Sequence, residues 1–537
     1  KIKAQSFVRK EGVIMKKTIK STRNSVVVLL LVFLMVFAGC TGPQSPANID
    51  KTENTTKTAT ERKVKDTLTI AIDAEPPTLL PQQTIKYNTT IICHDIFSHL
   101  VVQDADGNIH PDLAESWERP NNLTWRFHLK DNVYFHNGEK FTAEDVRYTF
   151  ELASKEPACL SHYAPLDIEN TKVVDELTID VALKYPFASF LELLATQRGT
   201  IICKSAIESM GRDAYARAPI GTGPYKFVSW VSGSELKLER FDDYFGEKAK
   251  TKNLVYKIIS ESAGRVIEVE TGAADIAYSI LPSDVDTVLD ADDLKLISTP
   301  GYSYYTITFN MQDEVVGGDK NLKLREALAY AIDKETLTEA LYGDTASPMY
   351  GVLPIKNVYS KEYSDKRYDV EKAKQLLAEA GYPNGLTVEY LCQPVQEMIS
   401  ISEAVQNMWK QIGVTAVITT SETAPYLAQG GKLQTGVRTG NMASADNTLV
   451  IYDSVFKDKI NSNDDYLDKM MYEAKQIYDE KSREAKYHAI SDHIWNNTIS
   501  FPLFVKDTLV VLSENVDGFV PHPLIESGVK SVVVYED

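Results

Sequence analysis

The chain has 537 residues, 43% of them hydrophobic and 25% charged, and its formal net charge is −18. This composition is that of an ordinary globular protein, and it excludes a fibrous or generally disordered chain. The excess of acidic residues also argues against nucleic-acid binding, which depends on Lys and Arg contacts to phosphate. The length allows roughly two to four domains with a sizeable core.

The first 39 residues are predicted to be an upstream segment followed by a signal peptide. Basic side chains between residues 16 and 23 precede an apolar run over residues 26–38, an order that is typical of a secretory signal. The run has 13 residues, whereas a membrane-spanning helix needs about 20. We therefore interpret Met15 as the start of translation and the apolar run as a segment that is removed.

Residues 37–40, Phe-Ala-Gly-Cys, resemble the bacterial lipobox, in which a peptidase cuts before a cysteine that receives diacylglycerol, although leucine is usual where Phe37 stands. The resemblance implies that Cys40 is lipidated; the alternative is an uncleaved anchor with a chance cysteine. Residues 40–65 have few large apolar side chains and are predicted to be a flexible linker. Removing the first 39 residues, with their eight Lys/Arg and one Glu, changes the net charge from −18 to −25. A lipid rather than charge would therefore hold the protein at a membrane.

Strand signals open the folded part of the chain. Residues 66–72 alternate polar and apolar side chains, which predicts a strand. The same alternation over residues 123–129 and 133–135, followed by Asn137-Gly138, predicts a hairpin or sheet edge with a turn.

Helix signals follow, separated by further strands. Thr142 begins a capping box ahead of an apolar face, so a helix is predicted to start there. Residues 370–380 have Asp369 as the N-cap and a glycine after the end, and residues 322–337 and 401–413 show the same helical spacing. This alternation of helices with β-branched strands indicates α/β layers with mixed sheets. The strands between and after these helices are predicted at 386–392 and 414–420.

Motifs of known catalytic chemistry are missing from the sequence. It contains no HExxH, GxSxG or GxxxxGK[ST] pattern, and no enzyme activity or cofactor is predicted. His488 and His493 are five positions apart and would lie on different faces of a helix, so no metal site is predicted. Four further cysteines without a CxxC spacing are expected to be small buried thiols, with disulfide pairing as the alternative: Cys93, Cys159, Cys203 and Cys392.

Six stretches carry a family resemblance in their order and spacing. They are "PDLAESWE", "LTWRFHLKDNVYFHNGEKFTAEDVRYTFE", "PIGTGPYKFVSW", "LKLREALAYAIDKETL", "YDVEKAKQLLAEAGYPNG" and "MWKQIGV". Together they resemble the extracellular solute-binding proteins of oligopeptide, dipeptide and nickel ABC importers, family 5, from Asp66 to the C-terminus. The resemblance implies an α/β, two-lobed, periplasmic-binding-protein-like fold with mixed sheets, a hinge between the lobes and an inserted subdomain in the N-terminal lobe.

The resemblance also implies boundaries and a function. The N-terminal lobe is expected over residues 66–300, with the inserted subdomain at about 97–205; the second lobe is expected over 301–503, and residues 504–537 return to the first lobe. A short peptide would bind in the cleft by hinge closure and pass to a permease and ATPase complex. The protein would be a monomeric, lipid-anchored receptor on the outer face of the membrane, extracellular or periplasmic.

Two charged residues are candidates for contact with the ends of a peptide. In peptide-binding relatives an aspartate of the second lobe accepts the terminal ammonium, and Asp446 falls at that position, although the usual "DYPDP" form is absent. The alternative for Asp446 is a loop or helix-cap aspartate. Arg438 is a candidate for a bidentate pair with a ligand carboxylate, and a surface ion pair is the alternative.

Polar and aromatic residues at the expected cleft rim complete the candidate site. Tyr87 and Asn88 lie in the segment that aligns with the family's cleft rim. Tyr302, Tyr304 and Tyr305 lie on the strand that crosses into the second lobe, where an aromatic wall is expected; at least one of the three should be a core residue.

Four other functions stay open at this point. A receptor for nickel or another metal chelate would share the fold, but the region around Asp446 contains no histidine. Other solutes are compatible with the same motifs. A surface hydrolase or a peptide-sensing lipoprotein would belong to a different class.

Overall fold

The computed structural model describes most of the chain after the linker. The predicted signal peptide, apart from Met15, and the lipidation site Cys40 lie outside the described residues. The residues that the structure describes are 13–15, 62–84, 86–422, 434–441, 444–454, 460, 462–524 and 528–536.

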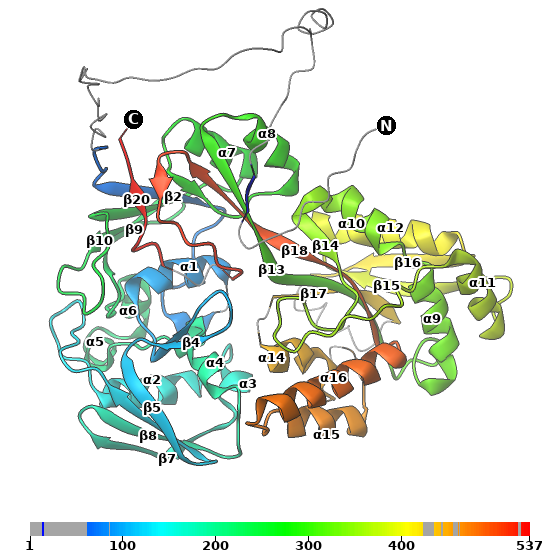
Figure 1. Ribbon diagram of the computed structural model, residues 1–537, viewed down its shortest axis with the longest axis horizontal. Helices are drawn as coiled ribbons and strands as arrows, with labels where there is room; N and C mark the ends of the chain where they lie inside the picture. The colour runs from blue at the N-terminus through cyan, green and yellow to red at the C-terminus, as the bar shows by residue number, and fades with distance from the viewer. Residues whose placement is uncertain are drawn as a thin grey trace, which may run out of the picture.

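Two lobes lie side by side, and two long strands pass between them (Figure 1). These strands are β13 (Leu294–Phe309) and β18 (Ser500–Ser513), which pair antiparallel along most of their length. They are the centre of a twelve-stranded sheet with the order β16-β15-β17-β13-β18-β12-β2-β11-β10-β9. Short strands β1 (Val13–Met15) and β14 (Ala346–Pro348) pair with β13 and β18.

The N-terminal lobe builds its part of this sheet around β2 (Thr67–Ile72), the strand predicted at residues 66–72. β2 pairs in parallel with both β11 (Asn253–Ile258) and β12 (Ile276–Ala277). Leu68, Ile70 and Ile72 are fully buried on one face, because alternate residues of a strand point to the same side. Antiparallel β10 (Glu235–Arg240) and β9 (Tyr225–Val231) extend the sheet to its edge.

A separate antiparallel sheet lies below this lobe in Figure 1, in the order β5-β6-β8-β7. Its strands are β5 (Ala114–Asn121), β6 (Thr124–Leu129), β7 (Leu166–Asp175) and β8 (Thr178–Leu183). The predicted strand at 123–129 is β6. Residues 133–135 are not a regular strand, but the predicted hairpin with its Asn137-Gly138 turn is present in short form. Tyr134 bridges antiparallel to Lys140, and the Phe141 amide donates to the Val133 carbonyl.

The helix predicted after Thr142 is α2 (Ala143–Ala153). Its capping box is present: the Thr142 backbone amide donates to Asp145 Oδ2 at 3.0 Å. A carboxylate in the first turn satisfies donors that the helix leaves unpaired. The prediction from local sequence is therefore confirmed at this helix start.

The second lobe places parallel strands β15 (Leu386–Cys392) and β16 (Val414–Thr420) beside β17 (Thr435–Asn441). α11 (Val370–Glu379) is present as predicted, and Asp369 caps it by accepting from the Lys372 amide. α12 (Gln396–Lys410) overlaps the helix predicted at 401–413 but begins five residues earlier and ends before Gly413.

The single helix predicted over residues 322–337 is wrong. The chain forms α9 (Leu322–Tyr330) and α10 (Lys334–Tyr342) instead. Asp333 stands between them with its side chain accepting from the Thr336 amide, so it begins a new helix. Both helices bury apolar residues, so the apolar spacing continues across the break. The periodicity of the sequence therefore gives no sign that the helix ends there.

Hydrophobic residues form separate clusters in the two lobes. A further cluster packs α14 (Ala445–Leu449), α15 (Asp465–Ala474) and α16 (Glu480–Asn496) beneath the second lobe. The four cysteines predicted to be buried thiols are buried and free. Across the described ranges, no helix has both the length and the apolar character needed to cross a bilayer. The other helices and strands are α1 (Tyr87–Ile96), α3 (Leu160–Tyr163), α4 (Phe190–Leu194), α5 (Lys204–Met210), α6 (Arg212–Arg217), α7 (Ser262–Glu270), α8 (Val285–Asp290), β3 (Val101–Gln103), β4 (Ile109–Pro111), β19 (Val516–Asp517) and β20 (Val533–Val534).

Candidate functional site

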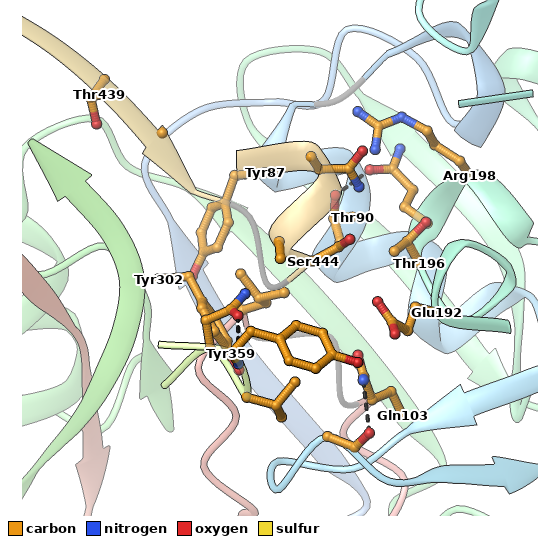
Figure 2. Close-up of a pocket in the computed structure, with 18 residues that line it drawn as sticks. Tyr87, Thr90, Gln103, Glu192, Thr196, Arg198, Tyr302, Tyr359, Thr439 and Ser444 are labelled. Carbon is orange, nitrogen blue, oxygen red and sulfur yellow. Dashed lines mark hydrogen bonds between the residues drawn. The ribbon is translucent and has the colours of Figure 1, made fainter. Parts of the chain in front are cut away.

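A cavity of about 380 Å³ lies between the two lobes and is lined by residues from both (Figure 2). The N-terminal lobe contributes the start of α1 and the segment from Glu192 to Arg198. The second lobe contributes β17, the start of α14 and residues 357–359. A solute held here would contact both lobes at once.

Tyrosines and two charged residues give the cavity its chemistry. Tyr87, Tyr302 and Tyr359 line it, and in Figure 2 they lie across from the Glu192–Arg198 segment. Among the described lining residues, Glu192 and Arg198 are the ones with charged side chains. Aromatic faces with a few fixed polar groups are typical of small-molecule sites.

Tyr302 is placed by an irregularity in the strands that join the lobes. The pairing of β13 with β18 shifts register between Pro300 and Ser303, so Gly301 and Tyr302 are inserted between two paired positions. A Cβ on Gly301 would lie 2.9 Å from the Lys506 carbonyl oxygen, which explains the glycine there. Bulges of this kind redirect a side chain, and here the Tyr302 ring reaches the cavity, where its hydroxyl donates to the Lys356 carbonyl at 3.3 Å.

Tyr87 stands at the first position of α1 and lines two cavities. It lines the cavity described above and a second one of about 740 Å³, and Leu524 also lines both. Burial raises the pKa of Tyr87 well above its ordinary value, so its hydroxyl stays protonated and can donate a hydrogen bond.

A cluster of polar side chains joins the lobes at the edge of the smaller cavity. Ser189 of the N-terminal lobe donates to Asp446 Oδ2 at 2.6 Å, and the Tyr487 hydroxyl donates to Asp446 Oδ1. Arg483 of α16 donates to the Ser189 hydroxyl and lies 3.7 Å from Asp446 Oδ2. The other guanidinium nitrogen is 3.6 Å from Glu192 Oε1.

Burial sets the protonation behaviour of this cluster. It raises the pKa of Glu192, an effect that Arg483 opposes and Asp446 reinforces. Burial alone would lower the pKa of Arg483, but Tyr487, Glu192 and Asp446 outweigh it and hold that pKa above its ordinary value. Arg483 is therefore a permanent cation beside two carboxylates.

Two of the predicted ligand-binding residues, Tyr87 and Tyr302, line the cavity. Asp446 does not line it, although its neighbours Ala445 and Asn447 do. The alternative is a loop or helix-cap aspartate; Asp446 lies in the first turn of α14, and the N-cap of that helix is Ser444.

The remaining predicted contacts lie behind the cavity wall and are not among its described lining residues. Arg438 is a buried residue of β17 opposite Thr306. Tyr304 packs with Met349 and Val505. Asn88 is buried in α1.

Sequence reasoning missed Glu192, Arg198 and Tyr359. One signal was present for Glu192, which interrupts the apolar stretch "FLELL" over residues 190–194. A carboxylate in such a run is rarely buried without a partner, but the sequence does not indicate that the partner is Arg483.

Comparisons with known proteins agree with this architecture. The family profile "Bacterial extracellular solute-binding proteins, family 5 Middle" matches residues 108–463. A glutathione-binding protein, GsiB, from Salmonella paratyphi A is 27% identical over 470 residues, covering 84% of this chain and 91% of the relative. GsiB from Pectobacterium atrosepticum is 30% identical over 380 residues, covering 69% and 72%.

Solved structures establish the fold. The ABC transporter substrate-binding protein CtaP from Listeria monocytogenes has a TM-score of 0.79 at 24% identity, covering 88% of this chain and all of the other. The oligopeptide-binding protein AppA from Bacillus subtilis, solved with a nonapeptide, has a TM-score of 0.72 at 23% identity, covering 89% of this chain and all of the other. The predicted two-lobed periplasmic-binding-protein fold is confirmed.

The family is one of non-catalytic, extracellular or periplasmic solute receptors, which confirms the prediction that the chain is not an enzyme. Its profile covers well over half of the chain. The chain belongs to the bacterial extracellular solute-binding proteins, family 5, and is the substrate-binding receptor of an ABC importer.

Proposed function

We propose that the receptor captures short peptides in the cavity between its lobes and delivers them to a membrane permease. The observation that carries this proposal is the cavity itself, which is walled by both lobes and lined by tyrosines with one acidic and one basic side chain. A short peptide has side chains and a backbone that can pack against aromatic rings, and it has two charged ends that can pair with an acidic and a basic side chain. It therefore matches this lining. Tyr87 and Tyr302 are the predicted residues that we retain as direct contacts.

The size of the cavity favours a small ligand. Its volume of about 380 Å³ lies near the lower end of the roughly 300–1,000 Å³ typical of small-molecule sites. We therefore propose peptides of about two or three residues. The relatives named as glutathione-binding proteins support this range, because glutathione is itself a tripeptide.

Capture is proposed to occur by hinge closure. The bulge at Pro300–Ser303 lies on one of the two long strands that pass between the lobes, and hinges are a few residues that absorb backbone rotation. Residues 66–300 and 301–503 would then move as the two lobes, with residues 504–537 returning to the first and about 97–205 forming the insert. Ligand contacts with both walls would favour the closed form.

Native mass spectrometry of the purified protein tests the ligand class. We expect adducts whose masses, after release and fragmentation, correspond to peptides of two or three residues. Release of a metal chelate or a sugar as the dominant adduct would contradict the peptide proposal and leave the receptor function intact. Intact recovery of an added tripeptide after denaturing the complex would further distinguish capture from hydrolysis.

The lipid anchor is a separate proposal that depends on the lipobox-like residues 37–40. A diacylated Cys40 would hold the receptor beside its permease through two hydrocarbon chains, which suffice for stable anchoring. Metabolic labelling with a radioactive fatty acid should mark the wild-type protein and leave Cys40→Ala unmarked. An unlabelled wild-type protein would contradict this proposal.

A further inference from the structure

The cluster at the edge of the cavity has an unbalanced charge. It contains two carboxylates, Glu192 and Asp446, and one guanidinium, Arg483. The Arg483 and Asp446 side chains are 8% and 7% exposed, and that of Glu192 is 26% exposed. With all three ionised, the cluster carries one net negative charge that water screens poorly, an arrangement that is costly unless a partner balances it.

Of the three charged residues of the cluster, Glu192 is the one that lines the cavity. Both oxygens of Asp446 accept hydrogen bonds from protein hydroxyls, those of Ser189 and Tyr487. Glu192, in contrast, lines the cavity, and in Figure 2 its carboxylate is turned toward the cavity interior. A solute in the cavity would therefore meet Glu192 before any other member of the cluster.

Arg483 lies at about the same distance from both acids, and its one positive charge cannot balance two carboxylates. It donates to Ser189, lies against Asp446, and its guanidinium carbon is 5.2 Å from the centre of the Tyr359 ring. Its distances of 3.6 Å to Glu192 Oε1 and 3.7 Å to Asp446 Oδ2 are both longer than the 2.7–2.9 Å of a charge-assisted hydrogen bond. The hydroxyls of Ser444 and Ser189 also lie against Glu192 and lower its pKa, but a carboxylate has about four acceptor sites, so Glu192 keeps acceptor capacity for a ligand.

We propose that Glu192 is the residue that binds a positively charged nitrogen of the solute, the terminal ammonium in the case of a short peptide. Asp446 is then a second acid that shares Arg483 with Glu192, so this single guanidinium leaves Glu192 incompletely balanced. This inference depends on the proposed function and assigns the ammonium contact to the N-terminal lobe. Burial raises the pKa of Glu192, which means that ionising this carboxyl is costly. A ligand cation would lower that cost, so this shift agrees with the proposed role.

The test compares capture of peptides with free and with blocked amines. The probe is a casein digest of short peptides mixed with the same digest after exhaustive acetylation, which removes the amine charge. Captured peptides are counted by native mass spectrometry. The wild-type protein should prefer free-amine peptides by at least about tenfold, because losing one partner of a buried charge pair costs more than that factor.

Three variants separate a ligand contact from a structural role. Glu192→Gln should lose the preference for free amines, whereas Glu192→Asp, which keeps the charge, should retain part of it. The matched control Glu169→Gln removes an exposed glutamate of β7 in the same lobe and should keep the full preference. Glu192→Gln leaves Asp446 and Arg483 as a neutral pair, so its unfolding temperature should not fall.

The outcomes distinguish this inference from the proposed function. Equal capture of free and acetylated peptides by the wild-type protein, or an unchanged preference in Glu192→Gln, would overturn the role of Glu192 while peptide capture stands. Failure of the wild-type protein to capture any peptide would overturn both. Loss of preference in Glu169→Gln as well would also overturn the assignment, because the effect would then follow overall charge.

Discussion

Replacing Arg483 with Gln removes the one cation from the buried cluster between the lobes. The change leaves Glu192 and Asp446 as two close carboxylates without a positive partner. Breaking a buried ion pair by removing one partner costs about 3–5 kcal/mol. Because Glu192 and Ser189 belong to the other lobe, separation of the lobes relieves much of this cost, so we expect the open form to gain rather than the whole protein to unfold.

The size of this shift follows from the same figure. At about 1.4 kcal/mol per factor of ten, a penalty of 3–5 kcal/mol changes the ratio of closed to open molecules by roughly a hundredfold to several thousandfold. Small-angle X-ray scattering of the ligand-free protein should therefore show a larger radius of gyration for Arg483→Gln than for the wild type. The unfolding temperature should fall only moderately, since opening lets water reach both carboxylates.

Two further variants make this experiment specific. Lys481→Gln removes an exposed cation from the same helix and should leave the scattering profile unchanged. The triple variant Glu192→Gln, Asp446→Asn, Arg483→Gln has no charge in the cluster and should be compact again. Identical scattering curves and unfolding temperatures for Arg483→Gln and the wild type would refute the reasoning that the cluster holds the lobes together.

Three other predictions concern the titration of Glu192, the space for a side chain at Gly301 and the accessibility of the cysteine thiols. Binding of a free-amine peptide should weaken as the pH falls toward the raised pKa of Glu192, because protonation removes the negative charge that attracts the ammonium. Calorimetry at several pH values should show this loss for the wild type and not for Glu192→Gln. The charged or titratable groups that face Glu192 are Arg483, Asp446 and Tyr359. Gly301→Ala should lower the free energy of unfolding by about 1–3 kcal/mol, since its Cβ would crowd the Lys506 carbonyl; an unchanged denaturation midpoint would contradict this. A thiol reagent should label the four buried cysteines only after denaturation, and fast labelling of the native protein would be the contrary result.

Local sequence predicted the parts of the fold that local interactions decide. Asp369 begins α11 and Thr142 begins α2 because a cap needs only residues within one turn. The prediction was wrong at Asp333, where a cap lies inside a continuous apolar pattern. Tyr302 was predicted as a candidate because the family resemblance identified the crossing strand, although the bulge that turns its ring into the cavity depends on pairing with β18.

The charge cluster could not be predicted in the same way. Arg483 and Ser189 are 294 positions apart in the chain, and only the contact between the lobes brings them together. A single sequence does not indicate which residues far apart in the chain lie close together in space. Asp446 was singled out by family position, and the structure shows that its carboxylate faces Ser189, Tyr487 and Arg483 instead of the cavity.

The placement of this cluster provides a physical link between binding and closure. Arg483 meets Glu192 only where the lobes touch, so the ligand-free contact forms with one excess negative charge. A ligand cation at Glu192 would remove that excess in the closed form, whereas in the open form water already solvates the carboxylate. The cation would thus bind the closed state more tightly, and a ligand shifts a conformational equilibrium only by its difference in affinity for the two states. A neutral solute of the same shape would lack this difference, so charge would select both what enters the cavity and whether the lobes stay closed around it.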